Sequence, residues 1–594
     1  MKGNLESLRR LMKKFGLDAY LVPGTDPHQD EYIPEFWQRR KFISGFRGSS
    51  GDVVITQSKA GLWTDSRYFL QAEQELDKDI FQLFKMGKPD VPGIKEWLTE
   101  ELGKGKVLGV DSQLLSHRDF EDLRSYLKNK DIRVKGVSKN LVDIVWKNRP
   151  NPSENKIRTY PLKYSGESTS KKLERVRKKM REQPADILVI SALDEIAWLF
   201  NIRGKDIKFN PLAIAFALIF RDKAMLFIER DKLTKRVFSS LKNTVAIYDY
   251  EKFFPMLGTL AEKSDRIWLD ESRTNQRIVD ILKKRTKIFS APSPVSFLKA
   301  IKNKTEIEGF RRAHIRDGAA MVKFLFWLDR TWKRQRITER LAAAKLKEFR
   351  AGGANYQGPS FETISAFGSH SAIVHYGATS ETDIALKNGN IYLIDSGAQY
   401  WDATTDITRT IFLGEPRRIH RECFTRVLQG LLSLTMLSFP QGTAGRHLDT
   451  VARLSLWKKG QNYGHGTGHG IGTYLNVHEG PHAISPQRCV GVALEPGMIT
   501  TIEPGVYLEN RFGIRLENVV LVEKDEKNSS PDSSFYRFET LTLCPIDRNL
   551  VKKDLLRQEE LDWFNAYHRK VKEIVSPLVD RDEKDWLEKA TRPI

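Results

Sequence analysis

The chain has 594 residues, which at roughly 100 to 200 residues per domain predicts about three domains. Its 40% hydrophobic and 29% charged residues are typical of a globular protein. The longest apolar runs are well short of the ~20 residues that span a bilayer, and the start has no apolar region or cleavage site of a signal peptide. We therefore expect a cytoplasmic protein with no membrane partner.

The net charge is the one unusual bulk property, since 97 Lys and Arg against 76 Asp and Glu leave +21. A charge of that sign makes nucleic acid a possible partner. The basic clusters lie far apart, however, and the first alternates with apolar residues as a solvated helix face does. These clusters span residues 171–182, 283–287 and 417–421. We expect no specific nucleic-acid binding.

The three cysteines also bear on the compartment. Cys423, Cys489 and Cys544 have no CxxC spacing and cannot form a disulfide framework. This pattern fits a reducing compartment.

The first half of the chain contains one order of elements twice. A helix capped by Asn4 and stopped by Gly16 is followed by a strand at 19–22. The order recurs as a helix that breaks at Pro184 and a strand at 186–190. Downstream of each strand comes a hairpin pattern, with turn residues between apolar runs. The hairpin patterns span residues 52–65 and 213–229.

Two tandem α/β domains of similar plan follow from this repeat. Segments rich in Pro, Ser, Asn and Gly form their borders at 148–168 and 290–294. After the second border, Thr305 and Glu308 have capping-box spacing and predict the start of a long helix. The predicted domains span residues 1–152, 153–300 and 301–594. Eight of the twelve histidines lie between residues 370 and 482, so we expect the chemistry in the third domain.

Two aspartates of that domain are predicted to approach each other. The strand-like run IYLID ends at Asp395, and DATTDITRTIF places Asp402, Thr404, Asp406 and Thr408 on one face by alternation. If the two runs pair, Asp395 and Asp406 are near neighbours across the strands. Their repulsion then requires a proton or a cation. The alternative is a turn whose aspartates accept hydrogen bonds from local backbone amides.

Two glutamates follow apolar strand patterns. Glu503 ends one strand before Pro504, and Glu517 is predicted to lie mid-strand before the run VVLV. Burying either carboxylate is costly unless something compensates it. A metal ion would do so. The alternative is a buried ion pair between Glu517 and Arg515, which is on the same face of the predicted strand.

His469 in GTGHGIG adds an imidazole, and its glycine neighbours let the backbone approach closely. A lone histidine among glycines is usually a loop residue. Four carboxylates and one imidazole together, however, carry the charge that neutralises two divalent cations. Oxygen-rich ligation favours Mn²⁺, Mg²⁺ or Co²⁺ over a thiolate zinc site. Two bridged metals about 3.5 to 4 Å apart hold a water as hydroxide, which attacks a carbonyl at neutral pH.

These residues, in this order, resemble the creatinase/methionine-aminopeptidase superfamily with its pita-bread catalytic fold. The chain is most similar to the three-domain aminopeptidase P family. The resemblance rests on the segments TTDITRT, GTGHGIG, NVHEGP, EPGVY, RLEN, WTDSRYFLQA, DEIAWLFNIRG and DLLRQEELDWFNAYH. It implies two creatinase-N-like α/β domains followed by a pita-bread domain of the α+β class with a C-terminal extension.

The resemblance also implies an activity and its residues. The activity is that of a metallo-aminopeptidase, dimeric and cytoplasmic, which uses a metal-bridging hydroxide to cleave the bond before a penultimate proline. The two divalent ions, first Mn²⁺ and alternatively Co²⁺ or Zn²⁺, would bind Asp395, Asp406, His469, Glu503 and Glu517. The other catalytic candidates are His375, His465, His478, Tyr507 and Arg515, with Glu503 in both sets. Independently, a proline imide nitrogen must be protonated to leave, which suits a neutral imidazole near its own pKa.

Two other functions fit parts of this pattern. A prolidase-type dipeptidase shares the ligands and the proline requirement, although the separate domain at 1–152 favours the longer form. An inactive pita-bread protein could bind a protein or a nucleic acid through its positive charge. Loss of a ligand would mark such a protein, and all five candidates are present.

Overall fold

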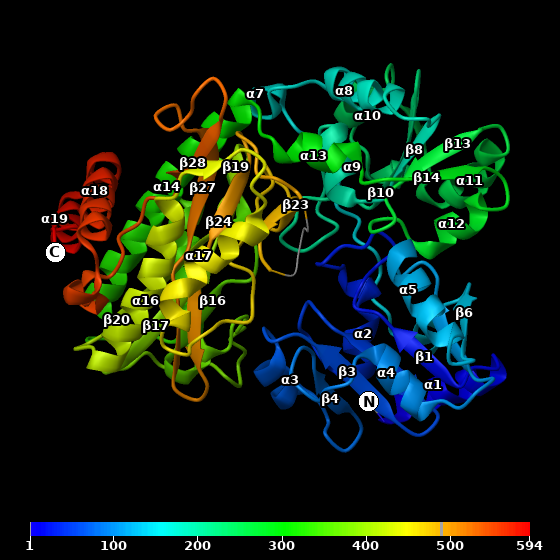
Figure 1. Cartoon of the computed structure of the whole chain (residues 1–594), viewed down its shortest axis with the longest axis horizontal. Coiled ribbons are helices and arrows are strands. Elements are labelled where there is room, and N and C mark those ends of the chain that lie inside the picture. The colour runs from blue at the N-terminus through cyan, green and yellow to red at the C-terminus, as the bar shows by residue number, and fades with distance from the viewer. Residues whose placement is uncertain (1, 487–490) are drawn as a thin grey trace. The chain divides into compact units, whose positions relative to one another are not determined.

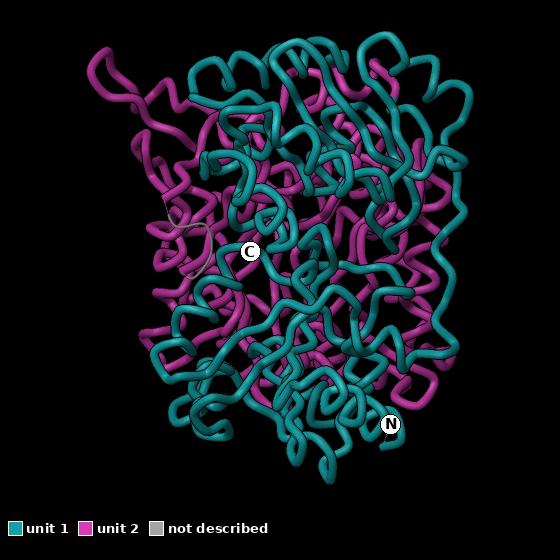
Figure 2. The backbone as a smooth tube through the Cα atoms, turned by 90° about the vertical axis from the view of Figure 1, so that its right-hand side faces the viewer, with its two compact units in different colours: residues 1–160, 167–296 teal, residues 161–166, 297–594 magenta. Residues whose placement is uncertain are grey.

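The computed structural model describes residues 2–486 and 491–594, so Cys489 lies outside the described residues. The chain divides into two units (Figures 1 and 2). Unit 1 is Met1–Tyr160 with Glu167–Ser296, and unit 2 is Pro161–Gly166 with Phe297–Ile594. Among the described residues, no helix combines the length and apolar character needed to cross a membrane.

Unit 1 contains two six-stranded sheets of the same plan, as the repeat predicts. The first runs β4 (Gln82–Lys85), β3 (Ala60–Thr64), β2 (Asp52–Thr56), β1 (Ala19–Val22), β5 (Val107–Asp111) and β6 (Arg133–Val137). The second runs β12 (Ala246–Tyr248), β11 (Ala224–Ile228), β10 (Ala215–Phe220), β8 (Ile187–Ile190), β13 (Arg266–Leu269) and β14 (Lys287–Ser290). In each, an antiparallel hairpin pairs with the first strand and the remaining pairs are parallel.

Helices cover these sheets with their apolar faces. In α1 (Lys2–Lys14) the side chains of Leu5, Leu8 and Met12 are buried, which is the predicted stripe. Asn4 lies inside this helix, so its predicted role as the N-cap is wrong. The other helices are α2 (Arg39–Ser44), α3 (Phe69–Glu75), α4 (Ile94–Glu101), α5 (His117–Lys128), α6 (Leu141–Val145), α8 (Thr169–Arg181), α9 (Leu193–Leu199), α10 (Lys235–Leu241), α11 (Phe253–Ala261) and α12 (Gln276–Leu282).

Polar contacts join the two halves of unit 1. The buried His28 ring contacts the Ser191 carbonyl at 2.8 Å, and Asn275 donates to the Pro27 carbonyl at 2.7 Å. Two short strands, β7 (Arg158–Thr159) and β9 (Ile202–Arg203), also pair in this unit.

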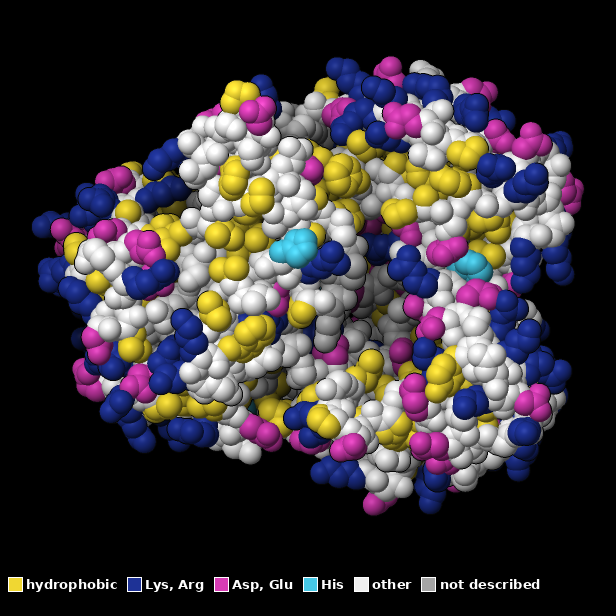
Figure 3. All heavy atoms as spheres, in the orientation of Figure 1, with side chains coloured by type: hydrophobic (Ala, Val, Ile, Leu, Met, Phe, Trp, Pro, Cys, Tyr) yellow, Lys and Arg dark blue, Asp and Glu magenta, His cyan; other side chains and the backbone are white. Residues whose placement is uncertain are grey.

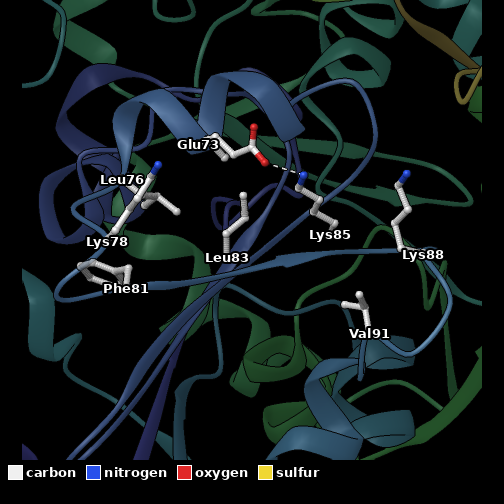
Figure 4. A pocket seen from close by; sticks show the side chains of 9 residues that line it. Glu73, Leu76, Lys78, Phe81, Leu83, Lys85, Lys88 and Val91 are labelled. Carbon is white, nitrogen blue, oxygen red and sulfur yellow. Dashed lines mark ion pairs between the residues drawn. The ribbon is translucent and has the colours of Figure 1, made fainter. Parts of the chain in front are cut away.

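A hollow of about 460 Å³ opens beside α3 and β4 (Figure 4). Leu76, Phe81 and Leu83 contribute apolar side chains to its lining. Lys85 also lines it and pairs with Glu73 at 2.5 Å.

Unit 2 is built on a six-stranded sheet and three smaller ones. The large sheet runs β21 (Phe439–Pro440), β28 (Phe535–Thr540), β27 (Asn518–Lys524), β24 (Ile499–Ile502), β22 (Gly468–Gly470) and β23 (Glu479–Ile484). The smaller sheets are β16 (Ile364–Phe367), β17 (Asn390–Ser396) and β20 (Ile407–Leu413); β15 (Tyr356–Pro359), β18 (Ala398–Tyr400) and β19 (Ala403–Thr404); and β25 (Gly505–Leu508) with β26 (Phe512–Arg515).

Helices of unit 2 pack on both faces of the large sheet. The helices of this unit are α7 (Leu162–Ser165), α14 (Lys304–Thr331), α15 (Glu339–Ala351), α16 (Arg418–Thr435), α17 (Gly445–Trp457), α18 (Gln558–Val575) and α19 (Arg581–Ala590); α13 (Pro294–Ala300) spans the border between the units. Along β27, Val520 and Val522 belong to the core formed with α16 and α17, while Val519 and Leu521 pack with residues of α14. Burial on both faces explains why this strand is apolar throughout.

The start of α14 differs from the prediction by two residues. Asn303 caps the helix, and Glu306 completes the capping box with it. Thr305 therefore lies inside the helix, and the predicted box of Thr305 and Glu308 is wrong. The spacing is the same in both pairs, so the motif alone could not decide between them.

We expect Gly318→Ala in α14 to destabilise the protein. A Cβ at Gly318 would lie 2.3 Å from the Leu543 carbonyl oxygen, so backbone must move. Overpacking of this kind costs about 1 to 3 kcal/mol and should lower the melting temperature in calorimetry. Gly258→Ala in α11 is the control, because its nearest neighbours lie at an ordinary 3.7 Å. Equal melting temperatures for the two variants would contradict this account.

Candidate metal centre

Strand pairing brings two of the predicted ligands together. β17 pairs with β20 in antiparallel register, with Asp395 opposite Thr408. Asp406 directly precedes β20, so the two aspartates come from adjacent strands, as expected. The run 402–412 is not one strand, however, because it divides between Thr404 and Ile407.

This division corrects the predicted single face of four residues. Asp402 accepts a hydrogen bond from Arg316 instead of joining the site. Thr404 donates to Gln399 Oε1 at 2.8 Å. Of the four residues, only Asp406 and Thr408 lie beside the other acidic side chains of the site.

The large sheet and its connections supply three more candidates. His469 lies on β22, where its N–H donates to Thr501 Oγ1 at 3.0 Å. Glu503 follows β24, and its N–H donates to the Thr467 carbonyl at 2.7 Å. Glu517 lies between β26 and β27, not mid-strand as predicted. Thr408 Oγ1 donates to its Oε2 at 2.9 Å.

The ligand atoms of these side chains converge. One atom each of Asp406, His469 and Glu517 lie within 4.8 Å of one another. His469 Nε2 is 3.6 Å from both Asp406 Oδ2 and Glu503 Oε1. Burial is the largest cause that raises the pKa of Asp406 well above its usual range, and the charges of Asp395 and Glu503 add to it. Burial and Asp406 do the same for the pKa of Glu517.

This geometry fits a pair of cations. His469 Nδ1 lies 3.0 Å from the Gly470 carbonyl, to which it must donate, so a neutral ring turns the lone pair of Nε2 towards the carboxylates. Among the described residues, Asp395 Oδ1 and Asp406 Oδ1 are buried without a hydrogen-bond partner. Lone pairs that face one another in a buried space repel unless a proton or a metal ion lies between them. The donor set of four carboxylates and one imidazole suits two divalent ions.

Arg515 is the cation that the chain itself supplies. Its Nη2 contacts Asp395 Oδ2 at 2.5 Å, so its ion pair is with Asp395 and not with Glu517. Burial opposes its charge, but Tyr507, Asp395 and Glu503 outweigh burial and hold the pKa of Arg515 well above its ordinary value. The predicted alternative of an Arg515–Glu517 pair is therefore replaced by a pair between strands of two different sheets.

A chain of hydrogen bonds runs from Arg515 to His465. Arg515 Nη1 donates to the Tyr507 hydroxyl at 2.7 Å, and that hydroxyl lies 2.8 Å from His465 Nε2. His465 Nδ1 lies 2.8 Å from the Gly466 carbonyl, to which it must donate, so Nε2 accepts from Tyr507. Burial raises the pKa of Tyr507 to about 12, which keeps it a donor.

The remaining candidate histidines are His478 and His375. The His478 and His469 rings are 4.4 Å apart between centroids and nearly perpendicular. His375 follows Val374, whose carbonyl accepts from Arg515 Nη2 at 3.4 Å. The structure thus gathers the five ligand candidates with Arg515, Tyr507, His465 and His478, and it brings the chain next to His375 to the same arginine.

Several supporting residues were not predicted. Asp449 and Arg453 form a buried ion pair at 2.6 Å, and Arg453 Nη2 donates to the His465 carbonyl at 2.7 Å. Their i, i+4 spacing on α17 was a readable signal. The two hydroxyls that hold Glu517 and His469, on Thr408 and Thr501, carry no such signal, because threonine is common in strands.

Comparisons with known proteins agree with this arrangement. Family models for the creatinase/prolidase N-terminal domain match residues 4–143 and 148–306. The model for metallopeptidase family M24 matches residues 308–524, and that for its C-terminal region matches 534–594.

Individual relatives match over different lengths. A probable Xaa-Pro aminopeptidase P of Tuber melanosporum is 41% identical over 99% of this chain and 98% of its own. The crystal structure of the Caenorhabditis elegans X-prolyl aminopeptidase, described as a cytosolic enzyme with a di-nuclear active site, is 36% identical over 100% of both chains, with a TM-score of 0.95. A Pyrococcus horikoshii prolidase is 25% identical, with a TM-score of 0.50, over 63% of this chain and 99% of its own.

The full-length matches include both creatinase-type sheets, whereas the prolidase leaves more than a third of this chain uncovered. The chain therefore belongs to the Xaa-Pro aminopeptidase P family of the M24 metallopeptidases, with creatinase-type N-terminal domains followed by a pita-bread catalytic domain.

Proposed function

We propose that this chain removes the N-terminal residue from peptides whose second residue is proline, with two divalent ions in the acidic centre. The ions would be held by Asp395, Asp406, His469, Glu503 and Glu517. The approach of His469 Nε2 to two carboxylates at 3.6 Å supports this proposal most directly. We propose Mn²⁺ first, since the set is mainly carboxylate, with Co²⁺ or Zn²⁺ as alternatives. When bound, the ions supply Lewis acidity and make water nucleophilic near neutral pH.

Arg515, Tyr507 and His465 act in this proposal as one hydrogen-bonded unit. Arg515 neutralises Asp395 and fixes the Tyr507 hydroxyl, which in turn fixes His465. Because Nδ1 of His465 donates to the Gly466 carbonyl and Nε2 accepts from Tyr507, the two ring nitrogens fix the orientation of the ring. A ring held in this way presents a constant edge to the substrate.

His478 and His375 complete the proposed pocket. We assign to His478 the proton that the proline nitrogen needs in order to leave, because its ring stands against that of His469. The ring of proline, with no N–H, would be selected by the shape of this pocket. The positively charged free amine of the substrate is attracted to the carboxylates. There it helps to balance their negative charge, which burial makes costly.

Four wider properties belong to the proposal. We propose a cytoplasmic homodimer without specific nucleic-acid binding, and domains that span residues 1–152, 153–300 and 301–594. On the face drawn in Figure 3, Lys and Arg side chains are interspersed with Asp and Glu, which supports diffuse rather than specific attraction to phosphates. The family models change near both proposed borders.

Asp395→Asn and Glu503→Gln should each abolish turnover, because each removes a charge that balances the cations. Chelation of the wild-type protein should have the same effect, and Mn²⁺ should restore it. The measurement is metal content together with hydrolysis of Ala-Pro-Ala. Asp532→Asn is the control, since this exposed carboxylate lies in the same unit. Normal turnover by the Asp395→Asn protein would rule out the centre as drawn.

His478→Ala should keep both metal ions and lower kcat by about 10² to 10⁴, the contribution of a positioned acid–base group. His447→Ala, an exposed histidine of α17, should leave kcat unchanged. Metal analysis of both proteins accompanies the kinetics. Loss of metal with the His478 ring would mean that His478 is a ligand.

Substrate selectivity distinguishes this activity from that of a general aminopeptidase and from that of a dipeptidase. At equal concentration with Mn²⁺, Ala-Pro-Ala should be cleaved well, whereas Ala-Ala-Ala, acetyl-Ala-Pro-Ala and Ala-Pro should not. Acetylation deletes the charge of the amine and so its attraction to the acidic centre. Chromatography of the products measures all four. Comparable cleavage of Ala-Ala-Ala would indicate a general aminopeptidase, and cleavage of Ala-Pro alone would indicate a dipeptidase.

A further inference from the structure

A second buried carboxylate of unit 2, Glu339, lies outside the acidic centre. It is the first residue of α15, and its side chain has no exposed surface. Its Oε1 accepts from the Phe367 N–H at 2.7 Å and contacts His370 Nδ1 at 2.9 Å, while its Oε2 accepts from the Tyr376 hydroxyl at 2.9 Å. A buried carboxylate persists only where such partners compensate its lost hydration.

These three partners belong to one segment of the chain, and a longer contact of Oε2, which accepts from the Ile384 N–H at 3.5 Å, comes from outside it. Residues 367–376 begin at the end of β16, pass through the short helix Gly368–Ala372 and end just beyond His375. We call this the 367–376 segment. Three hydrogen bonds that this one carboxylate accepts cross-link the start, the middle and the end of the segment. Glu339 therefore fixes the shape of the segment and not only one side chain.

The other side of the segment rests on β26, the strand that carries Arg515. Gly513 N–H donates to Ser371 Oγ at 2.7 Å. The approach is so close that a Cβ at Gly513 would lie 1.9 Å from the Ser371 carbonyl oxygen. Arg515 Nη2 reaches the Val374 carbonyl at 3.4 Å. The segment is thus held between Glu339 and the strand that organises the acidic centre.

His375 occupies the position between these two anchors. Val374, the residue before it, is held by Arg515, and Tyr376, the residue after it, is held by Glu339. Anchoring both neighbours fixes the backbone of His375 and therefore the origin of its side chain. A displacement of about 1 Å at such a position can cost on the order of 10² in rate.

We propose that Glu339, acting through Tyr376, is a positioning residue that sets the place of His375 in the substrate pocket. The inference rests on the proposed function, which gives His375 its contact with substrate. Glu339 itself touches neither the acidic centre nor the rings of His465 and His478 in the contacts described above.

The test is a double-mutant cycle between Tyr376 and His375. Tyr376→Phe removes the hydroxyl that donates to Glu339 and that also lies 3.1 Å from the Thr382 carbonyl and Oγ1. We expect it to lower kcat/KM for Ala-Pro-Ala by about tenfold without loss of metal. In the His375→Ala background the same change should have no further effect, because the residue being positioned is gone. Glu339→Gln, which keeps the volume of the side chain, should lower kcat/KM at least as much in the wild-type background.

Tyr400→Phe is the matched control. Tyr400 is fully buried and its hydroxyl donates to another buried carboxylate, Asp317 Oδ1, at 2.9 Å, outside the 367–376 segment. It should cost stability similar to Tyr376→Phe, measured as the melting temperature, and leave kcat/KM unchanged. Equal kcat/KM for Tyr376→Phe and Tyr400→Phe, or a loss that persists without His375, would overturn the inference alone. Failure of metal-loaded wild-type protein to cleave Ala-Pro-Ala would overturn the proposed function, and this inference with it.

Discussion

Repulsion between buried carboxylates is the constraint on which the catalytic unit depends. Asp395, Asp406, Glu503 and Glu517 gather where burial already disfavours charge, so burial and like charge together raise the pKa of Asp406 and of Glu517. In the part of the chain that the structure describes, Arg515 is the buried cation in contact with Asp395. One positive charge cannot balance four negative ones. The folded chain thus creates an electrostatic deficit that divalent ions are suited to fill, and metal binding and stability of this unit should be linked.

The second constraint is that the rings of His469 and His465 each have a defined donor and a defined acceptor. His469 and His465 each donate from Nδ1 to the carbonyl of the following glycine, which leaves Nε2 of each ring as an acceptor. In His469 that acceptor faces carboxylates, and in His465 it faces the Tyr507 hydroxyl. Two histidines four residues apart therefore have different chemistry. The difference arises from what the surrounding strands place opposite them and not from the local sequence.

Much of the fold could be read from the sequence because its signals are local. The strand at 19–22, the stripe of α1 and both hairpins of unit 1 depend on apolar periodicity and turn residues, which act over a few positions. Helix starts were less accurate, since Asn303 and Thr305 both precede a glutamate at the same spacing. The run 402–412 misled for a related reason. Its alternation fits one strand, but Asp402 is drawn to Arg316 on α14, a partner far away in the sequence.

The candidate site followed the same rule. The ligand candidates could be selected because burying a charged or imidazole side chain beside apolar strands is costly unless a partner compensates it. These candidates are Asp395, Asp406, His469, Glu503 and Glu517. The partner of Arg515 could not be chosen from the sequence, because alternation places Arg515 beside Glu517. Only the packing of β26 against β17, a strand of another sheet, places it against Asp395. The role of Glu339 could not be predicted from the sequence at all. Glu339 opens an amphipathic helix, where an acidic residue is ordinary, and all its significance comes from hydrogen bonds to residues 28 or more positions away.

Arg515 and Glu339 also explain why the centre needs so much of unit 2. Arg515 joins β26 to Asp395 on β17 and to the carbonyl before His375, and Glu339 holds the residue after His375 from α15. The proposed substrate contact at His375 and the charge at Asp395 therefore depend on one guanidinium. Substitution of Arg515 would disturb both the charge balance of the acidic centre and the proposed pocket around His375. Substitution of Tyr376 would affect only the proposed pocket. That separation lets the electrostatic and the geometric contributions of the 367–376 segment be measured independently.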